Sequence, residues 1–538
     1  MKLNKDPFRI LSTIFFGITF IINIGFCQLD NNKWAKLYYE GKSDDLHTFH
    51  ILPNNDIILA GWTNANLNLN EDIILLRIDE TGNIIWQYSY GAFELDYAQT
   101  MAPTLDSNII VGCQTRSFGA GSTDILLLKV DLEGRILWQK AYGTYDDNAI
   151  ASVIPTPDGG YLVGGWSYLG TGRSHDATIF KTDRDGNLLW SKHYGTKNYE
   201  GIKDMIPTYD GNYIFVAMTS SEETQFDIWL VKIDTLGNII WEKSYGGNGN
   251  DIPSTILNFD GFYYIIGYSN SFSSDGKNDM FLLVVDDFGN IQWAYNYPND
   301  YSTTIINASP FANDKILATG SAIAQSSDNS DLLISILKKN GLFEKGMLFV
   351  GNDSELGFCI KQYTTNSILA GGYSYSFSNG NSDIILIRTD SSLSIPDGEM
   401  QTKNYLLDAE PHPINFQTLA TSAIIDTTRL TVTDALLQRM PLNFEMRNLN
   451  ISTSQIHNTI QNDYDIKLNA NNQIILKLNK LNYKKLNARI LNLLGQEVVT
   501  FSTENSSSQY VFQTTDLGIG FYLFEVKELN LVFPFIRY

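Results

Sequence analysis

Aromatic side chains recur at one position of this sequence, and exposed aromatic rings make good stacking platforms for sugars. The position lies 28 residues after a regularly spaced Trp, except in one unit that is a residue short. Its seven members are Trp62, Gln114, Trp166, Met218, Tyr268, Ser321 and Tyr373. Large side chains at a repeated position also serve packing between structural units. The four aromatic members, Trp62, Trp166, Tyr268 and Tyr373, are therefore candidate ligand contacts, with packing as the alternative.

A second series is mostly acidic and lies 10 residues after the same Trp positions. Its members are Asp44, Asp96, Asn148, Glu200, Asp251, Thr303 and Glu355. A ring of carboxylates could hold a cation or a basic ligand. The structural alternative is that each carboxylate accepts hydrogen bonds from backbone N–H groups of an adjoining loop. On the first interpretation the candidate binding residues are Asp44, Asp96, Glu200, Asp251 and Glu355.

Signatures of catalysis are sparse. The chain has six His and none of the common motifs: a nucleophile elbow, a phosphate-binding loop or a zinc-protease helix. A carboxylate pair for glycoside chemistry cannot be selected among 59 acidic residues. We therefore predict no catalytic residue and leave open whether the chain is an enzyme. No cofactor is expected except calcium, for which the acidic loop at Asp146 and Asp147 is a weak candidate, and metal ligands are otherwise unknown.

The elements that must position these residues repeat every 52 residues, with one gap of 51. An Asp opens an apolar strand in each repeat, at Asp72, Asp124, Asp176, Asp227, Asp279, Asp331 and Asp383. A turn with Gly follows, and then a strand with Trp, at Trp34, Trp86, Trp138, Trp190, Trp241 and Trp293, with Lys345 in the seventh place. Regularity of this kind favours structural roles for both series, the Trp residues serving packing.

Each repeat predicts four strands, which in the second repeat span roughly 96–104, 108–115, 124–131 and 135–142. Tight turns such as Pro157-Asp-Gly-Gly160 supply the positive φ that hairpins need. Four short antiparallel strands at a fixed period are typical of propeller blades. The seventh repeat lacks its Trp strand, and residues 33–40 supply a matching one. The predicted fold is therefore all-β: a seven-bladed propeller over 28–396, with its last blade closed by the N-terminal strand.

The blade pattern resembles those of kelch-like and quinoprotein-like propellers. The resemblance rests on Gly pairs such as Gly164-Gly165 and Gly371-Gly372, and on the spacing from Asp131 to Trp138. Quinoprotein dehydrogenases usually have eight blades, and some use a vicinal cysteine pair. This chain has seven repeats and no such pair, so the resemblance implies a device for blade packing and not a bound cofactor.

Charge and cysteine content exclude some classes of partner and bond. A net charge of −21 repels phosphate backbones, so nucleic acid is not an expected partner. Of the three cysteines, Cys27 lies in the leader, and Cys113 and Cys359 lie in the second and seventh repeats. Bridged cysteines need Cα atoms within about 7 Å, so we expect two buried thiols.

The N-terminus predicts a signal peptide over residues 1–27. Lys2, Lys5 and Arg9 precede an apolar run over 10–26, and a signal peptidase could cut before Gln28. A retained membrane anchor is the alternative, because the run is almost long enough to span a bilayer. No other segment is apolar enough, so we expect no membrane span after cleavage.

The repeat ends at Pro396. Residues 397–463 indicate a linker with some strands, and residues 464–538 a small β-sandwich domain. This domain resembles the C-terminal sorting domain of the type IX secretion pathway in Asn492–Val498 and Leu517–Leu523, which include Gly495, Gln496, Gly520 and Tyr522. The usual Asn-Pro element and terminal lysines are absent, and an ordinary β-sandwich is the alternative. The resemblance implies export through the secretion machinery, to the medium or the outer cell surface.

Three functions are compatible with these features. The first is a secreted binding or adhesion propeller for a carbohydrate or a surface protein. The second is a secreted polysaccharide hydrolase or lyase that uses the same loops, and the third is a structural component of the cell-surface layer. The sequence defines neither the ligand nor the oligomeric state.

Overall fold

The computed structural model contains β-strands and, in the part of the chain that it describes, no helix. It describes residues 33–39, 42–64, 70–170, 174–196, 198–220, 225–312, 314–325, 327–377, 380–396, 400–405 and 412–415, and twelve strands between 417 and 537. The predicted leader, with Cys27, lies outside the described residues, as do Gly495 and Gln496. The chain forms two compact units, the first ending at Arg447 and the second holding the strands from Tyr464 onward.

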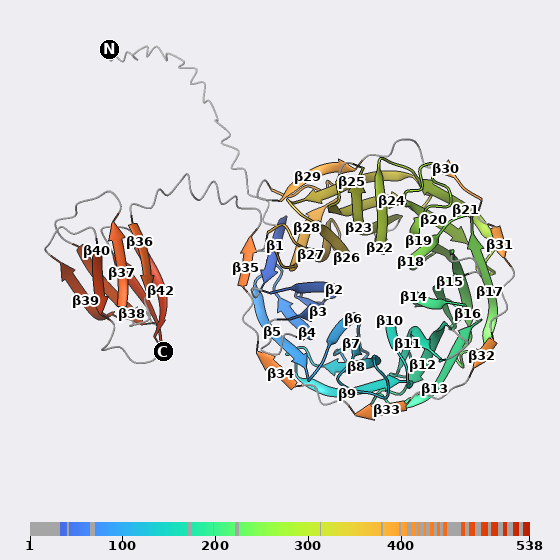
Figure 1. The fold of residues 1–538 in the computed structure, drawn as a ribbon, viewed down its shortest axis with the longest axis horizontal. Coiled ribbons are helices and arrows are strands. Elements are labelled where there is room, and N and C mark those ends of the chain that lie inside the picture. Colours follow the sequence, from blue (N-terminus) through green and yellow to red (C-terminus); the bar gives the residue numbers. More distant parts are fainter. Residues whose placement is uncertain are drawn as a thin grey trace, which may run out of the picture. The chain divides into compact units, whose positions relative to one another are not determined.

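The first unit is the predicted seven-bladed propeller (Figure 1). Blade 1 contains β2 (Asp44–Ile51), β3 (Ile57–Thr63), β4 (Asp72–Ile78) and β5 (Ile84–Gly91). Blade 2 contains β6 (Asp96–Pro103), β7 (Ile109–Thr115), β8 (Asp124–Val130) and β9 (Ile136–Gly143). Blade 3 contains β10 (Asn148–Pro155), β11 (Tyr161–Tyr168), β12 (His175–Thr182) and β13 (Leu188–Gly195).

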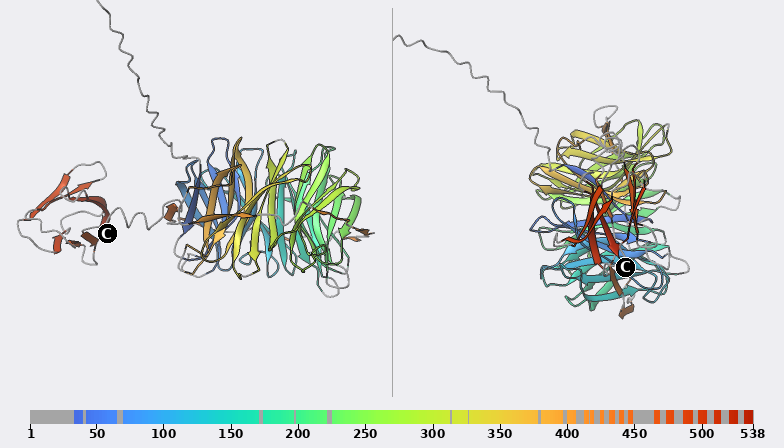
Figure 2. Two further views of the ribbon diagram at one scale, coloured as in Figure 1. Left: turned by 90° about the horizontal axis from the view of Figure 1, so that it is seen from above. Right: turned by 90° about the vertical axis from the view of Figure 1, so that its left-hand side faces the viewer.

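The remaining blades follow the same order from the inside of the ring to the outside. Blade 4 contains β14 (Glu200–Pro207), β15 (Tyr213–Ser220), β16 (Phe226–Ile233) and β17 (Ile239–Gly246). Blade 5 contains β18 (Asp251–Phe259), β19 (Phe262–Ser269), β20 (Asp279–Val285) and β21 (Ile291–Tyr297). Blade 6 contains β22 (Tyr301–Phe311), β23 (Lys315–Ala324), β24 (Ser330–Lys338) and β25 (Phe343–Val350). The strands run between the two faces of the ring (Figure 2).

Blade 7 is closed by the N-terminal strand, as predicted. It contains β26 (Glu355–Thr364), β27 (Ser367–Ser374), β28 (Asp383–Asp390) and β1 (Trp34–Tyr39). β1 pairs antiparallel with β28, with Trp34 opposite Arg388 and Tyr38 opposite Ile384. An ion pair of 2.7 Å between Lys33 and Asp390 lies at the same joint. The two ends of the repeat array are thus joined within one sheet.

The Trp series packs blade against blade, as predicted. Trp86 donates from Nε1 to the carbonyl of Leu132 in the next blade at 3.0 Å. Four residues later, Tyr90 donates to the carbonyl of Gly134 at 2.6 Å. The same tyrosine bond recurs from Tyr38, Tyr142, Tyr194, Tyr245 and Tyr297 to Gly82, Gly186, Gly237, Gly289 and Gly341. The fourth strand of one blade therefore docks on the last hairpin of the next.

A fifth strand on each blade comes from the segment for which the sequence indicated a linker with some strands. We call residues 401–448 the belt. Its strands are β29 (Gln401–Tyr405), β30 (His412–Pro413), β31 (Gln417–Leu419), β32 (Ile424–Asp426), β33 (Thr431–Asp434), β34 (Gln438–Pro441) and β35 (Glu445–Asn448). In this order they extend blades 6, 5, 4, 3, 2, 1 and 7, so the belt makes one circuit of the rim (Figure 1).

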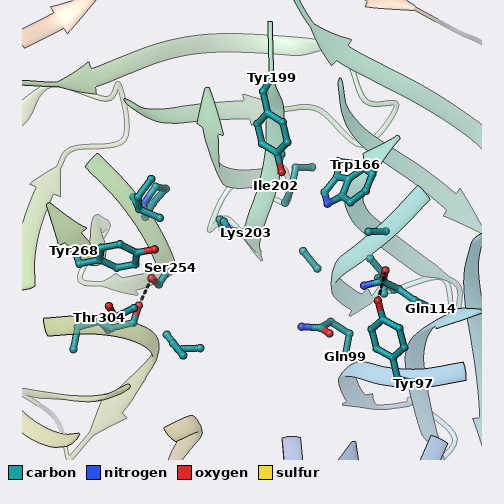
Figure 3. A pocket seen from close by; sticks show the side chains of 18 residues that line it. Tyr97, Gln99, Gln114, Trp166, Tyr199, Ile202, Lys203, Ser254, Tyr268 and Thr304 are labelled. Atoms are coloured by element: carbon teal, nitrogen blue, oxygen red, sulfur yellow. Dashed lines mark hydrogen bonds between the residues drawn. The ribbon is translucent and has the colours of Figure 1, made fainter. Parts of the chain in front are cut away.

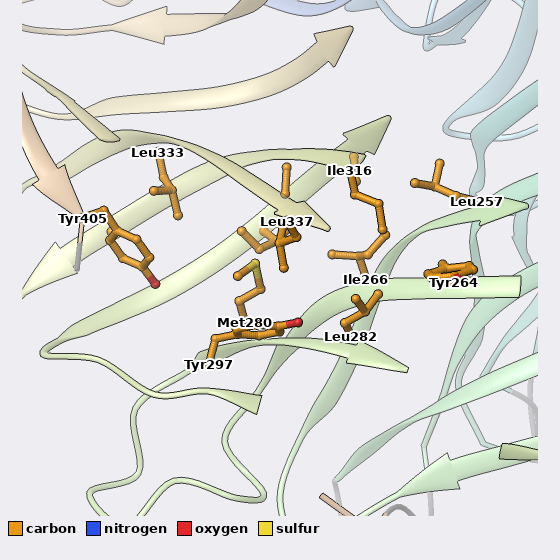
Figure 4. Packing of buried hydrophobic residues seen from close by; sticks show 14 of the residues in the cluster. Leu257, Tyr264, Ile266, Met280, Leu282, Tyr297, Ile316, Leu333, Leu337 and Tyr405 are labelled. Carbon is orange, nitrogen blue, oxygen red and sulfur yellow. The ribbon is translucent and has the colours of Figure 1, made fainter. Parts of the chain in front are cut away.

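Tyr405 anchors the start of the belt in the core between blades 5 and 6 (Figure 4). Its side chain is 1% exposed and packs near the rings of Tyr301 and Phe343. Its hydroxyl accepts from Asn299 Nδ2 at 2.8 Å and shares a hydrogen bond of 2.9 Å with Thr303. The residues before it in β29 are exposed, so this one side chain provides the buried contact of the strand.

The second unit contains two antiparallel sheets. One has the order β36 (Tyr464–Leu468), β37 (Gln473–Leu478) and β40 (Gln509–Gln513). The other has the order β39 (Glu497–Thr503), β38 (Leu486–Asn492), β41 (Gly520–Val526) and β42 (Leu531–Arg537). Gly520 and Tyr522 thus lie at the start of β41. In β38, Ala488 and Ile490 are buried whereas Arg489 between them is exposed, as expected for a strand with one covered face.

Two further expectations can be compared with the structure. Cys113 in β7 and Cys359 in β26 are buried free thiols, as predicted. Among the described residues we find no helix long and apolar enough to cross a membrane.

Candidate ligand-binding cavity in the central channel

The innermost strand of every blade carries a β-bulge at the same position. Pairing between the first and second strands skips one residue in each blade. The skipped residues are His47, Gln99, Ala151, Lys203, Ser254, Ile306 and Phe358. Bulges bend a strand and re-aim a side chain, and they are frequent beside functional sites. We call these seven residues the bulge ring.

These bulges explain why Gly-Gly pairs recur in the sequence. The second Gly of the pair lies opposite the bulge, as in Gly165 opposite Ile150. A Cβ on Gly165 would lie 1.9 Å from the carbonyl oxygen of Ala149. The same close approach to a first-strand carbonyl occurs at Gly61, Gly267, Gly320 and Gly372. Glycine therefore permits the bulge where the two strands come closest.

The bulge ring combines repeated geometry with varied chemistry. All seven residues are at least partly exposed, and the residue just before each bulge is buried. Their side chains are two apolar aliphatic groups, one aromatic ring, one amide, one hydroxyl, one imidazole and one ammonium group. Positions that serve packing in this repeat keep one residue type in six of the seven repeats, as the Trp and Tyr series do, with Lys345 and Phe349 in the remaining repeat. The variety indicates that the bulge ring is shaped for something other than blade packing.

Five members of the bulge ring line a cavity of about 540 Å³ in the central channel (Figure 3). The cavity extends over the inner strands of blades 2 to 6. Its lining comprises Tyr97, Gln99, Gln114, Ala149, Ile150, Ala151, Trp166, Tyr199, Gly201, Ile202, Lys203, Ile252, Pro253, Ser254, Tyr268, Thr304, Ile305 and Ile306. Rings, amides and hydroxyls thus share one concave surface, which is the usual composition of a small-molecule site.

Hydrogen bonds hold several polar groups of the lining in place. Tyr97 donates to Gln114 Oε1 at 2.9 Å, and Gln99 Oε1 lies 3.1 Å from His47 Nδ1. Ser254 donates to the carbonyl of Ile305 in the next blade at 2.5 Å. Burial lowers the pKa of His47 to about 4, so this imidazole is neutral near pH 7. The amide groups therefore present fixed dipoles to the cavity.

An aromatic wall borders the cavity at blades 3 and 4. The centroid of Trp166 lies 4.5 Å from that of His175, and His175 lies 5.0 Å from Tyr199. Tyr199 in turn contacts Phe226, with centroids 5.6 Å apart. Gly201 makes room for this wall, because a Cβ there would lie 2.9 Å from the hydroxyl oxygen of Tyr199. Contacts of this kind restrict the rings and leave the cavity-facing surface preformed.

The aromatic candidates divide into two groups. Trp166 and Tyr268 line the cavity, on opposite sides of it in Figure 3, together with Gln114 of the same series. Trp62 and Tyr373 occupy the equivalent positions in blades 1 and 7 and are not part of this lining. Tyr373 instead lies near Phe358 and Tyr375, with centroids 5.8 and 5.5 Å away.

The acidic candidates lie outside the cavity lining and are buried. Four of them accept a hydrogen bond from the backbone N–H four residues earlier: Asp96 from Ala92, Glu200 from Thr196, Asp251 from Gly247 and Glu355 from Gly351, at 2.7–3.2 Å. Asp44 is likewise buried, and its own N–H donates to Ser382. These contacts match the structural alternative given for the series. Burial nevertheless raises the pKa of Glu355 to about 7.

The Asp that opens the third strand of a blade interacts with an acidic or amide side chain at the start of the next blade in three places. Burial and the neighbouring Asp251 raise the pKa of Asp227 to about 6. At the closure of the ring, burial and Asp45 raise the pKa of Asp383 to about 7. Where Asn148 replaces an acid, its amide instead donates to Asp124 at 3.1 Å. No group of three or more His, Cys, Asp or Glu in the described part of the chain is arranged to hold a metal ion.

The sequence identified part of this site and missed the rest. Tyr97, Gln99, Tyr199, Lys203, Ser254 and Thr304 line the cavity and were not predicted. A signal was present, because the position 13 residues after each Trp holds a different residue type in every repeat. It was missed because a regular strand does not reveal where a bulge turns a side chain into the channel.

Comparisons with known proteins concern the fold alone. No protein family model matches the sequence, and no curated protein is similar to it. A protein of unknown function from Dyadobacter fermentans DSM 18053 is 10% identical, with a TM-score of 0.38 over 54% of this chain and 93% of that one. The polysaccharide lyase Uly1 is 10% identical, with a TM-score of 0.41 over 64% and 89%. The Hadza microbial sialidase Hz136 is 10% identical, with a TM-score of 0.35 over 60% and 74%.

Proposed function

We propose that this chain is a secreted or cell-surface binding protein whose propeller takes a carbohydrate in the central cavity. The observation that carries the proposal is the lining itself: Trp166 and Tyr268 lie on two sides of a cavity whose polar groups are amides and hydroxyls. Aromatic faces stack on sugar rings, and fixed amides and hydroxyls exchange hydrogen bonds with sugar hydroxyls. The volume of about 540 Å³ lies within the range of small-molecule sites.

Binding is favoured over glycoside hydrolysis by one feature of the lining. Most glycosidases use two carboxyl groups on either side of the scissile bond. None of the 18 described residues that line this cavity is Asp or Glu. The acidic side chains at the start of the inner strands, such as Asp96 and Glu200, are buried and accept hydrogen bonds from the adjoining loops.

A thermal-shift screen of the full chain against neutral and acidic glycans tests the proposal. A ligand present at about 100 times its Kd stabilises the folded state by about 2.7 kcal/mol, which gives a clear shift. We expect a glycan-specific shift that Trp166→Ala abolishes and Trp62→Ala keeps, because Trp62 occupies the same position of another blade outside the cavity. A shift lost with Trp62→Ala but kept with Trp166→Ala would place binding elsewhere. Absence of any shift would favour a purely structural component of the cell surface.

The route of export is part of the proposal and rests on the C-terminal unit. Its β41 begins at Gly520 and includes Tyr522, two of the residues that resemble a type IX sorting domain. The proposed partner is the secretion machinery, and the proposed location is the medium or the outer surface. Deleting residues 464–538 should retain the chain inside a bacterium that has this pathway, whereas fusing them to a reporter should export it. Equal export with and without these residues would contradict this part.

A further inference from the structure

Among the described residues that line the cavity, Lys203 is the one with a formal charge. It is the bulged residue of blade 4, so its side chain leaves the regular alternation of β14. Figure 3 shows it between Tyr268 and Trp166. The charge therefore belongs to the same cavity as the two rings that we propose stack on a sugar.

The ammonium group of Lys203 has no ion-pair or hydrogen-bond partner among the described residues. Its side chain is exposed to solvent within the cavity; desolvation by the surrounding strands lowers its pKa, and no carboxylate raises it. The adjacent carboxylate of Asp204 does not approach it but accepts from the N–H groups of Met205 at 2.7 Å and Ile256 at 3.2 Å.

Other lysines of the blades behave differently. Lys129, Lys181 and Lys232 are buried, unlike Lys203, and each forms an ion pair, with Asp106, Asp158 and Asp210, at 2.7–3.0 Å. In a chain with 59 acidic and 38 basic residues, a partner for a lysine is easily supplied. The side chain of Lys203 is exposed to the solvent of the cavity, so its unpaired ammonium group is available for a charge-assisted hydrogen bond with an anionic ligand.

We infer that the cavity selects saccharides that carry a carboxylate or a sulfate ester, with Lys203 as the specificity-determining residue. This inference rests on the proposed carbohydrate function and specifies its ligand class. A single cation in a protein of net charge −21 suits one acidic group at the site, not a densely charged polyanion. The rings of Trp166 and Tyr268 would hold the sugar while the ammonium group pairs with its acid.

Titration calorimetry of the full chain tests this inference with matched pairs of glycans that differ in one acidic group: a disaccharide with a single galacturonate residue and its methyl ester, and a monosulfated galactan oligosaccharide and its desulfated form. Charged hydrogen bonds contribute about 1.5–3 kcal/mol, so we expect one acidic member to bind about 10-fold or more tightly than its neutral counterpart. Lys203→Met should reduce that member to the affinity of the neutral one, and Lys203→Arg should retain the preference. The preferred pair distinguishes carboxylate from sulfate.

Three results separate this inference from the proposed function. If neutral glycans bind as tightly as acidic ones and Trp166→Ala weakens both, the carbohydrate function stands and the role of Lys203 is wrong. If Lys203→Met binds the acidic glycan as tightly as the wild type, the role of Lys203 is likewise wrong. If no glycan of either kind binds, the proposed function itself fails.

Discussion

The hydroxyl of Tyr90 in blade 1 donates a hydrogen bond of 2.6 Å to the carbonyl of Gly134 in blade 2. Gly134 has a φ of 72°, a conformation that favours glycine. A Cβ on Gly134 would lie 2.8 Å from the hydroxyl oxygen of Tyr90, whose hydrogen bond the Gly134 carbonyl accepts. Six such pairs repeat around the ring, so the turn glycine and the strand tyrosine together form the joint between blades.

Removing the hydroxyl should weaken this joint without opening a large cavity. Tyr90 is fully buried, so Tyr90→Phe leaves the carbonyl of Gly134 without its side-chain donor. Loss of one partner of a buried hydrogen bond costs about 1–3 kcal/mol. Chemical denaturation should show a fall in the free energy of unfolding of that size. As a control, Tyr88→Phe changes a less buried tyrosine of the same strand, and an equal loss there would argue against the joint.

The paired glycines provide a test of the bulge. A Cβ on Gly165 would lie 1.9 Å from a backbone oxygen, whereas the nearest atom to one on Gly164 is the flexible Met205 Cε at 3.3 Å. Gly165→Ala should therefore destabilise the propeller by about 1–3 kcal/mol or more, and Gly164→Ala by less. Comparison of the two melting temperatures checks this. Equal effects would show that the bulge tolerates a side chain.

The repeat predicted much of this architecture because its signals are local. Asp72 and its equivalents open strands, and Gly134 marks a turn whatever the rest of the chain does. The closure by β1 was also predictable, because the seventh repeat lacks a Trp strand and the N-terminal residues 33–40 supply a strand of the same type. The belt was not, because a strand such as β30, with only two residues, has no detectable periodicity. Its pairing is decided by the exposed edges of distant blades.

The cavity was only partly predictable for a related reason. Trp166 and Tyr268 were predicted from residue type, because exposed aromatic rings at a repeated position are candidate stacking platforms for sugars. Lys203 was not, because the side chains of a regular strand alternate and only the bulge brings this one into the channel. Asp96 and Glu355 are buried and accept hydrogen bonds from backbone N–H groups of the loops that precede them. The sequence predicted such hydrogen bonds only as the alternative to a binding role.

The belt should contribute strongly to stability through one side chain. Tyr405→Ala removes a ring that is 1% exposed and the hydrogen bonds at Asn299 and Thr303. Large-to-small changes at buried aromatic positions cost about 3–5 kcal/mol. Asn404→Ala, at an exposed position of the same strand, should change the free energy of unfolding by less than about 0.5 kcal/mol. If both variants unfold like the wild type, the belt does not stabilise the ring.

The buried carboxyls predict that acidification stabilises the propeller. Asp383 and Glu355 have pKa values raised to about 7, against about 4 in the unfolded chain. The folded state thus binds more protons in this window, and its stability falls as pH rises from about 4 to 7. Below about pH 4 the trend reverses, because pairing with Lys129 and Lys181 lowers the pKa of Asp106 and Asp158 to about 2.

Denaturation at pH 5 and pH 8 checks this prediction, with Asp383→Asn as the diagnostic variant. The variant cannot ionise, so it should be more stable than the wild type at pH 8 and similar to it at pH 5. A wild type that is more stable at pH 8 than at pH 5, or a variant with unchanged pH dependence, would contradict the prediction.

A saccharide should bind in the cavity between Trp166 and Tyr268. The most direct measurement is a calorimetric titration of the best glycan from the thermal-shift screen into the wild type and into Trp166→Ala, Tyr268→Ala and Trp62→Ala. Aromatic residues at the centre of a binding site contribute about 2 kcal/mol or more each, so the first two variants should bind about 30-fold more weakly. Trp62→Ala should bind like the wild type. Unchanged affinity in both cavity variants would show that the ligand binds elsewhere and would contradict the proposed function.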